Sequence, residues 1–337
     1  MLRVKEIQEF FSTPIDSGVA KSLFDLLHTV PGFVRLRDDN GAEEINWTAL
    51  QEYYTICQKM CDDMLLVNVN SNLMIPVENK YIAVPHAVSS APDELERMLD
   101  NGYYDFKYRG FVYTRDYFAN SVLAIDGIKP DGNPDIGTAF YIGDKRFVTA
   151  AHCVKDYSKF RLLKPDGSTI MLKEVWFANG YDTNAYDLAI IIVDDEMDMS
   201  AFEMDDPAVL DDVLVMGYPQ ISGFNAIQTA ETATVGAYQK SSTGQVVGAD
   251  RSYLLQLDFF LINARVKGGN SGGPIINKTG RVVGVVVKLP FDNQSDSNAP
   301  RYDLMGYGIC LPSKYIKQLM DSPEIVGLTL VGEYYRL

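Results

Sequence analysis

The 337-residue chain is 47% hydrophobic and 22% charged, a composition typical of a globular protein that buries a sizeable core. Its length suggests two domains, or one large β domain with an extension. The formal charge of −15, from 30 basic and 45 acidic residues, comes with no basic patch, which argues against nucleic acid or an anionic membrane as a partner.

The N-terminus and the cysteines favour a soluble, cytoplasmic protein. Charged residues occur within Met1–Phe10, where a signal peptide needs an apolar segment, and no run of about 18 apolar residues occurs that would span a membrane. Two of the four cysteines, Cys57 and Cys61, share one face of a helical pattern, where disulfide geometry is poor, so we expect free thiols in a reducing cytosol. The three histidines are scattered, so neither a Cys/His zinc site nor any other metal or cofactor is expected.

Residues 1–115 are predicted to form a mixed, mainly α-helical domain without a catalytic motif. The apolar spacing predicts helices over 4–11, 18–30, 48–64 and 93–99 and a short strand over 80–85. The aromatic run from Tyr103 to Phe118 is interpreted as a packing or interface strip rather than a binding site.

Residues 116–337 are predicted to form a mainly β domain. Short β-prone runs occur at 121–125, 138–142, 147–150, 170–172, 188–193, 213–216, 254–262, 275–276 and 282–288, and one helix is expected at 313–320. Clusters of Gly, Pro, Asp and Asn separate many of these runs. This spacing indicates an all-β sandwich or a pair of barrels.

The stretch Gly268–Pro274 has the composition of a nucleophile loop. Ser271 has glycines on both sides, and glycine permits the dihedral angles of a tight turn that leaves the hydroxyl exposed. Because glycine has no Cβ, neighbouring backbone amides can converge and form an oxyanion hole beside that hydroxyl. Taken alone, such a stretch is more often a glycine-rich hairpin turn, so its interpretation depends on partners elsewhere in the chain.

Two further residues are suitable partners. His152 follows the predicted strand at 147–150, at a strand end where a side chain is both held and accessible. Asp187 opens the apolar run 188–193, so its carboxylate is expected to be partly buried and to need a hydrogen-bond partner such as an imidazole. Each of these residues alone is more often structural. Together, the order His152, Asp187, Ser271 on a many-stranded β scaffold indicates a base, an orienting carboxylate and a nucleophile for acyl transfer.

These motifs resemble those of the trypsin-like (chymotrypsin-fold) serine proteases, over about residues 118–320. The matching stretches are Thr-Ala-Ala-His-Cys at 149–153, Asp-Leu-Ala at 187–189 and Gly-Asn-Ser-Gly-Gly-Pro at 269–274. The resemblance implies a double Greek-key β-barrel of two six-stranded barrels with the active site between them, and a serine endopeptidase that hydrolyses protein or peptide substrates through an acyl-enzyme. Residues 306–313 and the asparagine before the serine are most similar to the bacterial high-temperature-requirement (Do-like) branch, whose usual PDZ domain does not fit in the short remainder of the chain.

The resemblance also implies a role for each site residue. His152 takes the proton of Ser271 as the hydroxyl attacks the scissile carbonyl, and later returns it to the leaving amine. Asp187 fixes the tautomer of the imidazole. The backbone amides of Gly269 and Ser271 receive the oxyanion.

Two departures from secreted family members agree with a cytosolic enzyme. Asn270 occupies the position of the aspartate that pairs with the freed N-terminus of activated zymogens, so activation through that salt bridge is not expected. The cysteine that pairs with the position of Cys153 in secreted members is absent, because the nearby residues here are Ile136 and Gly137.

Substrate preference rests on three candidate residues. Arg265 lies six positions before the serine, where the resemblance implies the floor of the primary specificity pocket, and a buried cation there would favour an acidic substrate residue. The alternative is that Arg265 points to solvent or pairs with a surface carboxylate. Residues 286–289 are expected to pair with the substrate backbone, which makes Val287 and Leu289 further pocket candidates.

The role of residues 1–115 is open between two hypotheses. They either dock a regulatory or recruiting protein partner, as in bacterial stress or defence systems, or inhibit the protease in cis until a signal arrives. For the whole protein, the alternative from another class is a non-catalytic protease-like scaffold or interaction protein.

Overall fold

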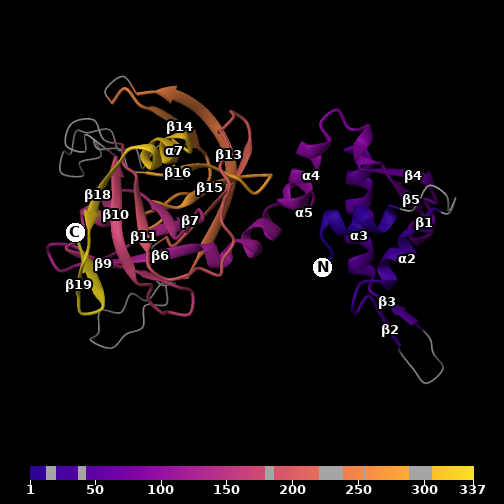
Figure 1. Cartoon of the computed structure of the whole chain (residues 1–337), viewed down its shortest axis with the longest axis horizontal. Helices are drawn as coiled ribbons and strands as arrows, with labels where there is room; N and C mark the ends of the chain where they lie inside the picture. Colours follow the sequence, from indigo (N-terminus) through magenta and orange to yellow (C-terminus); the bar gives the residue numbers. More distant parts are fainter. Residues whose placement is uncertain (13–19, 37–42, 179–185, 220–237, 253–254, 288–305) are drawn as a thin grey trace. The chain divides into compact units, whose positions relative to one another are not determined.

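The computed structural model describes residues 1–12, 20–36, 43–178, 186–219, 238–252, 255–287 and 306–337. The chain forms two compact units, Met1–Gly110 and Phe111–Leu337 (Figure 1). The sequence places this boundary slightly later, after residue 115. The boundary instead falls within α5 (Tyr103–Tyr117), where Gly110 leaves the helical conformation with φ 73° and ψ −167°. Glycine adopts such angles without the penalty that a side chain incurs.

The first unit combines helices with small antiparallel sheets. Its helices are α1 (Val4–Phe11), α2 (Leu23–His28), α3 (Trp47–Asp62), α4 (Pro92–Asp100) and the first part of α5, with the 3-10 helices η2 (Pro76–Glu78) and η3 (His86–Val88). Its strands are β1 (Lys21–Ser22), β2 (Val34–Leu36), β3 (Glu43–Ile45), β4 (Leu66–Asn70) and β5 (Lys80–Ala83). The order β1-β5-β4 makes one sheet, and β2 pairs with β3.

Local sequence explains how these helices form and which face they bury. Val4, Ile7 and Phe11 recur at helical spacing along α1 and are fully buried in the core of the unit. The helix expected over 18–30 is shorter in the structure, because Ser22 caps α2 by accepting a hydrogen bond from the N–H of Asp25 (3.1 Å).

The second unit is mainly β. Its first nine strands are β6 (Val122–Ile128), β7 (Pro134–Tyr141), β8 (Arg146–Thr149), β9 (Lys159–Leu163), β10 (Leu172–Ala178), β11 (Ala189–Val193), β12 (Asp212–Gly217), β13 (Lys240–Arg251) and β14 (Asp258–Ile262). The others are β15 (Pro274–Asn277), β16 (Val282–Val286), β17 (Gly308–Pro312), β18 (Pro323–Gly327), β19 (Thr329–Val331) and β20 (Tyr334–Arg336). The helices are the end of α5, η4 (Ala119–Ser121), α6 (His152–Lys155) and α7 (Lys314–Asp321).

The expected mainly β architecture, preceded by a helical region, is confirmed. Six strands close a barrel in the order β12-β13-β14-β17-β16-β15 (Figure 1). The other nine form one sheet in the order β18-β10-β11-β8-β7-β6-β9-β20-β19, which approaches a barrel without closing.

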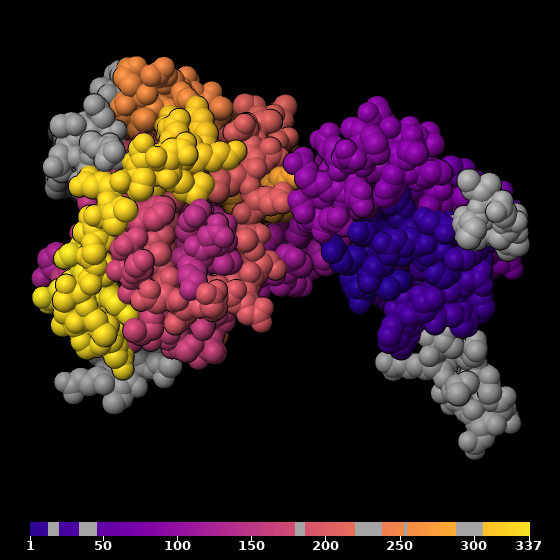
Figure 2. Space-filling model, in the orientation of Figure 1, coloured from indigo at the N-terminus to yellow at the C-terminus, as the bar shows by residue number. Residues whose placement is uncertain are grey.

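The C-terminal strands extend both edges of this nine-stranded sheet. β18 pairs with β10 from Glu174 opposite Gly327 to Ala178 opposite Pro323. β20 meets β9 where Tyr335 lies opposite Phe160. Figure 2 shows the segment in yellow on the outside of the second unit. The last residues of the chain therefore extend the sheet whose strands β8 and β11 lead to His152 and Asp187.

Candidate active site

Two neighbouring strands bring His152 and Asp187 together. β8 pairs antiparallel with β11, with Thr149 opposite Ala189, so the residues that follow β8 lie beside those that precede β11. Asp187 binds His152 twice: the His152 backbone N–H donates to Oδ1 (2.9 Å), and ring nitrogen Nδ1 contacts Oδ2 (2.7 Å). The pair thereby fixes both the backbone and the ring of His152, and it leaves Nε2 on the opposite edge of the ring for a second partner.

The surroundings of His152 favour its protonated form. The two side chains are 23% and 21% exposed, so the pair is partly shielded from water. Burial by itself lowers the pKa of His152, but the adjacent Cys153 and the hydrogen-bonded carboxylate of Asp187 outweigh it and raise that pKa above its ordinary value. A partly shielded imidazole oriented by a carboxylate is suited to accept a proton and to carry the resulting charge.

The loop before Ser271 contains a type II turn. The N–H of Asn270 donates to the carbonyl of Lys267 (3.0 Å), and Gly269, at the third position of this turn, has φ 95°. A Cβ on Gly269 would lie 2.3 Å from the carbonyl oxygen of Tyr218. Glycine is therefore required here for two reasons, the positive φ and the close approach of another backbone.

A second glycine is required directly after Ser271. Gly272 has φ 81°, and a Cβ there would lie 2.2 Å from the carbonyl oxygen of Thr138. The N–H of Gly272 donates to the carbonyl of Val286 (2.8 Å), which ties the loop to β16. Ser271 thus lies between two glycines that let the loop pack against strands of both sheets.

The loop leaves two amides without an acceptor. Within the described part of the chain, neither the N–H of Gly269 nor that of Ser271 donates a hydrogen bond. The Ser271 side chain is half-buried, and no hydrogen bond joins its hydroxyl to His152 among the residues described. The Cys153 sulfur lies 3.5 Å from the Ser271 carbonyl oxygen, so the loop contacts the residue that directly follows His152.

The structure describes two of the three specificity candidates, Arg265 and Val287. The side chain of Arg265 is exposed, and its backbone N–H donates to the hydroxyl of Ser242 (2.9 Å). Val287 is 6% exposed, and its N–H donates to the carbonyl of Ile309 (3.0 Å). Leu289 lies outside the described residues. The exposure of Arg265 agrees with the alternative in which this side chain points to solvent.

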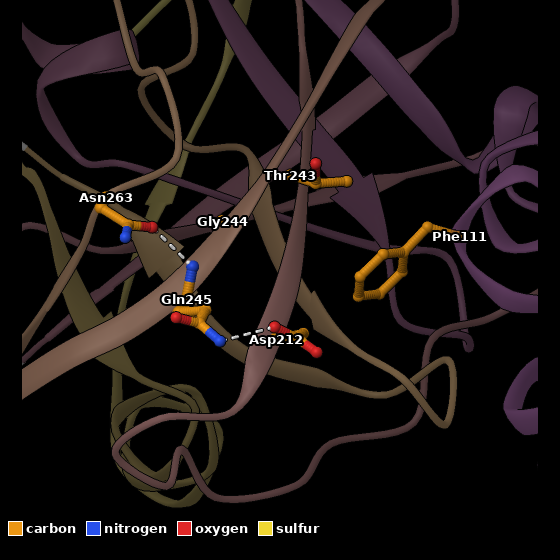
Figure 3. Close-up of a pocket in the computed structure, with 6 residues that line it drawn as sticks. All are labelled: Phe111, Asp212, Thr243, Gly244, Gln245 and Asn263. Carbon is orange, nitrogen blue, oxygen red and sulfur yellow. Dashed lines mark hydrogen bonds between the residues drawn. The ribbon is translucent and has the colours of Figure 1, made fainter.

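A separate pocket of the second unit does not include these residues. Figure 3 shows it, with a volume of about 560 Å³, lined by Phe111, Asp212, Thr243, Gly244, Gln245 and Asn263. Its polar groups largely bond one another: the Gln245 amide donates to Asp212 (2.9 Å) and the Gln245 N–H to Asn263 (2.7 Å). Across the described ranges, no three His, Cys, Asp or Glu side chains are grouped to hold a metal ion. No helix in those ranges is long and apolar enough to cross a membrane.

Comparison with known proteins gives a family match for part of the second unit. Residues 137–285 match the trypsin-like peptidase domain. The chain is 29% identical over 195 residues to a protein of Arabidopsis thaliana named as a mitochondrial Do-like protease, covering 57% of this chain and 30% of that protein. It is 28% identical over 187 residues to a protein of Rhizobium meliloti named as a DegP-like periplasmic serine endoprotease, covering 55% of this chain and 32% of that protein.

The chain therefore spans about a third of the length of these two relatives. Among solved structures, the active form of the Rv3671c protease from M. tuberculosis is 22% identical, with a TM-score of 0.48, and the match covers 65% of this chain and 86% of that one.

Proposed function

Because the chain carries a trypsin-like peptidase domain related to the DegP- and HtrA-type serine proteases, we propose that it is a serine endopeptidase with Ser271, His152 and Asp187 as its triad. The observation that carries this proposal is the two-point hydrogen bonding of His152 to Asp187 beside a serine loop with two unpaired amides. Protein or peptide substrates follow from the family.

The geometry supports the following reaction. Ser271 Oγ attacks the scissile carbonyl carbon while its proton passes to Nε2 of His152, and Asp187 stabilises the imidazolium. The carbonyl oxygen, now negative, accepts hydrogen bonds from the N–H groups of Gly269 and Ser271. The C–N bond then breaks, the proton of His152 moves to the departing amine, and an ester to Ser271 remains. A water molecule, deprotonated by His152, hydrolyses this ester and regenerates the hydroxyl.

The test is the variant Ser271→Ala, with Ser168→Ala, an exposed serine, as the matched control. We expect Ser271→Ala to lower turnover on a peptide substrate by at least about 10⁴-fold and to abolish labelling by a fluorophosphonate probe, with the fold retained. Ser168→Ala should behave as the wild type. Undiminished cleavage by Ser271→Ala would contradict the proposal.

A map of the cleavage sites that the wild type produces and Ser271→Ala does not produce tests the preference assigned to Arg265. We propose that Arg265, with Val287 and Leu289, contributes to the primary specificity pocket, and the test sets this against the alternative with which the exposure of Arg265 agrees, a side chain that points to solvent. An enrichment of Asp or Glu on the acyl side of the cleaved bonds supports a cation in that pocket. Cleavage without such enrichment contradicts it.

The second candidate function is a non-catalytic protease-like scaffold. It is less well supported, because a scaffold has no need for the His152–Asp187 pair or for the two glycines that only a tight serine loop requires. Probe labelling at Ser271 that is lost in His152→Ala would distinguish an enzyme from a scaffold.

Two further parts of the proposal concern setting and control. All four cysteines are free thiols, which supports a reducing, cytoplasmic location, although the relatives above carry mitochondrial and periplasmic names. The first unit, which has no catalytic motif, is proposed to control the activity or the targeting of the second, through a protein partner or in cis.

A further inference from the structure

Thr138 is a polar residue in the interior of the second unit. It lies on β7, between β6 and β8, and it is 0% exposed. A buried hydroxyl must be hydrogen-bonded if it is not to destabilise the fold. The partners of this hydroxyl therefore show what it does.

All the polar groups of Thr138 are used, and two of them bind the nucleophile loop. Its hydroxyl donates to the carbonyl of Gly269 (2.6 Å) and accepts from the N–H of Tyr218 (3.1 Å). Its backbone N–H donates to the carbonyl of Ser271 (2.9 Å). Its carbonyl accepts from the hydroxyl of Thr149 (2.7 Å), the last residue of β8. One residue of the open sheet thus contacts the loop on both sides of Asn270.

These bonds fix the peptide groups around the two unpaired amides. The peptide between Gly269 and Asn270 is held at both ends, because its N–H binds the carbonyl of Lys267 and its carbonyl accepts from Thr138. The next carbonyl, that of Asn270, accepts from the N–H of Gly273 (2.9 Å). The carbonyls of residues 269, 270 and 271 are therefore all occupied, whereas the amides of Gly269 and Ser271 have no acceptor among the described residues and are open to a ligand.

The type II turn depends on this anchoring. In a type II turn the central peptide, here between Gly268 and Gly269, is rotated by about half a turn relative to a type I turn, which reverses the direction of the Gly269 N–H. A glycine at the third position tolerates both forms, so local sequence does not decide between them. Holding the following peptide and the Ser271 carbonyl in place limits the angles that Gly269 can adopt.

We propose that Thr138 is a positioning residue that holds the loop 267–271 in the conformation whose amides receive the oxyanion. The proposal rests on the proposed protease function. Without the hydroxyl, the carbonyl of Gly269 and the N–H of Tyr218 each lose a buried partner, and the turn gains freedom to rotate its central peptide. Transition-state stabilisation then falls, while substrate binding, which does not use the oxyanion contacts to the same degree, changes little.

The test compares Thr138→Val, which has nearly the same shape without the hydroxyl, with Thr138→Ser, which restores the hydroxyl. The control is Ser121→Ala, which removes another buried hydroxyl, 1% exposed and donating to the carbonyl of Ser200 (2.6 Å). We expect Thr138→Val to lower kcat about 100-fold with KM within about threefold. The affinity of a peptide boronic acid, whose tetrahedral adduct uses the same amides, should fall by a similar factor. Thr138→Ser and Ser121→Ala should stay within about threefold of the wild type.

A wild-type kcat in Thr138→Val, or an equal loss in Ser121→Ala, would overturn the proposal. If Thr138→Val does not fold, Thr138→Ala, which only removes atoms, takes its place in the comparison. If the wild type shows no Ser271-dependent cleavage, the proposed function fails, and amide hydrogen exchange in the full chain then decides the role of Thr138. Exchange in the loop 267–271 that is about tenfold faster in Thr138→Val supports the anchoring, and unchanged exchange contradicts it.

Discussion

At the scale of single residues, the base of the proposed triad has to be neutral before it can act. The environment of His152 favours the charged form instead, because the carboxylate of Asp187 stabilises the imidazolium and raises the pKa of His152 despite burial. The same interaction makes His152 a stronger base once it has lost its proton. Activity is therefore expected to rise with pH until the imidazole is deprotonated.

Asp187→Asn separates these two effects. The amide keeps the shape of the side chain and removes its charge, so the pKa of His152 should fall and the acid limb of the profile of kcat/KM against pH should move to lower pH. Turnover at the optimum should fall by about 10⁴-fold, because the imidazole is no longer held as the required tautomer. The stability that Asp187 gives to the folded state is present below the unfolded pKa of His152 and is lost as pH rises through the raised folded pKa, so the variant should be destabilised mainly at low and neutral pH. An acid limb that does not move would contradict this account.

Residue chemistry also sets how much of the site the sequence predicts. His152, Asp187 and Ser271 stand out because their chemistry needs particular residue types in a particular order. Thr138 does not stand out in the sequence, since a threonine in a predicted strand is ordinary. Its proposed role depends on the hydrogen bond from its hydroxyl to the carbonyl of Gly269, which only the folded chain brings together. The sequence also leaves open whether Arg265 lines a pocket or points to solvent, because the packing of the neighbouring loops decides its exposure.

At the scale of elements, buried strands with continuous apolar runs such as β11 are predicted, whereas the largely exposed strands β13 and β19 and the more buried strands β9 and β17 are not. β11 is buried along its whole length and reads clearly as a strand. β13 is mostly polar with only Val246 fully buried, and β19 is three residues long and exposed throughout, so neither has a long apolar run. Tertiary pairing holds such strands in place, and single-sequence reading does not detect it. For the same reason, the extension of the nine-stranded sheet by residues 323–337 was not expected.

One contact between elements explains why glycine stands at position 137 in β7. A Cβ there would lie 2.7 Å from the sulfur of Cys153 and 3.0 Å from its Cβ. Gly137→Ala should therefore overpack the contact between β7 and α6 and lower the free energy of unfolding by about 1–3 kcal/mol, measured by urea denaturation. The control, Gly248→Ala in β13, meets nothing within 4 Å and should change it by less than about 0.5 kcal/mol.

Replacing Cys153 by Ala in the Gly137→Ala background removes the sulfur and should recover part of the loss. If it recovers nothing, the steric explanation is wrong. Because Cys153 follows His152, Gly137→Ala should also reduce turnover, by displacing the base from the serine loop.

At the scale of the whole molecule, the residues of the proposed site belong to one unit. His152, Asp187, Ser271 and Thr138 all lie within Phe111–Leu337, and the hydrogen bonds described for them stay within that unit. The first unit has a hydrophobic core of its own, formed by residues between Val4 and Tyr108. A unit with its own core is expected to fold independently, so the two units are separable by truncation.

The position of the cut matters for that experiment. The ring of Phe118 stacks on Phe202 with centroids 3.8 Å apart, and Thr114 is fully buried, so the end of α5 belongs to the second unit. A chain that begins at Phe111 should therefore fold and cleave a generic peptide at least as fast as the full chain. A chain that begins at Ala119 loses the Phe118 stack and should unfold at lower temperature, by several degrees.

The activity of the 111–337 chain then decides between the two roles of the first unit. If the first unit inhibits the second in cis, the 111–337 chain should cleave the peptide faster than the full chain, by the factor by which the first unit lowers that rate. If it recruits a target, peptide cleavage should stay unchanged while cleavage of a protein substrate of the full chain is lost. Adding residues 1–110 as a separate chain provides the control. An inhibitor that acts through a direct contact should restore inhibition in a concentration-dependent way. A recruiting unit supplied as a separate chain should not restore cleavage of the protein target. Loss of peptide cleavage by a folded 111–337 chain would contradict both roles, and it would show that the first unit contributes to the catalytic machinery itself.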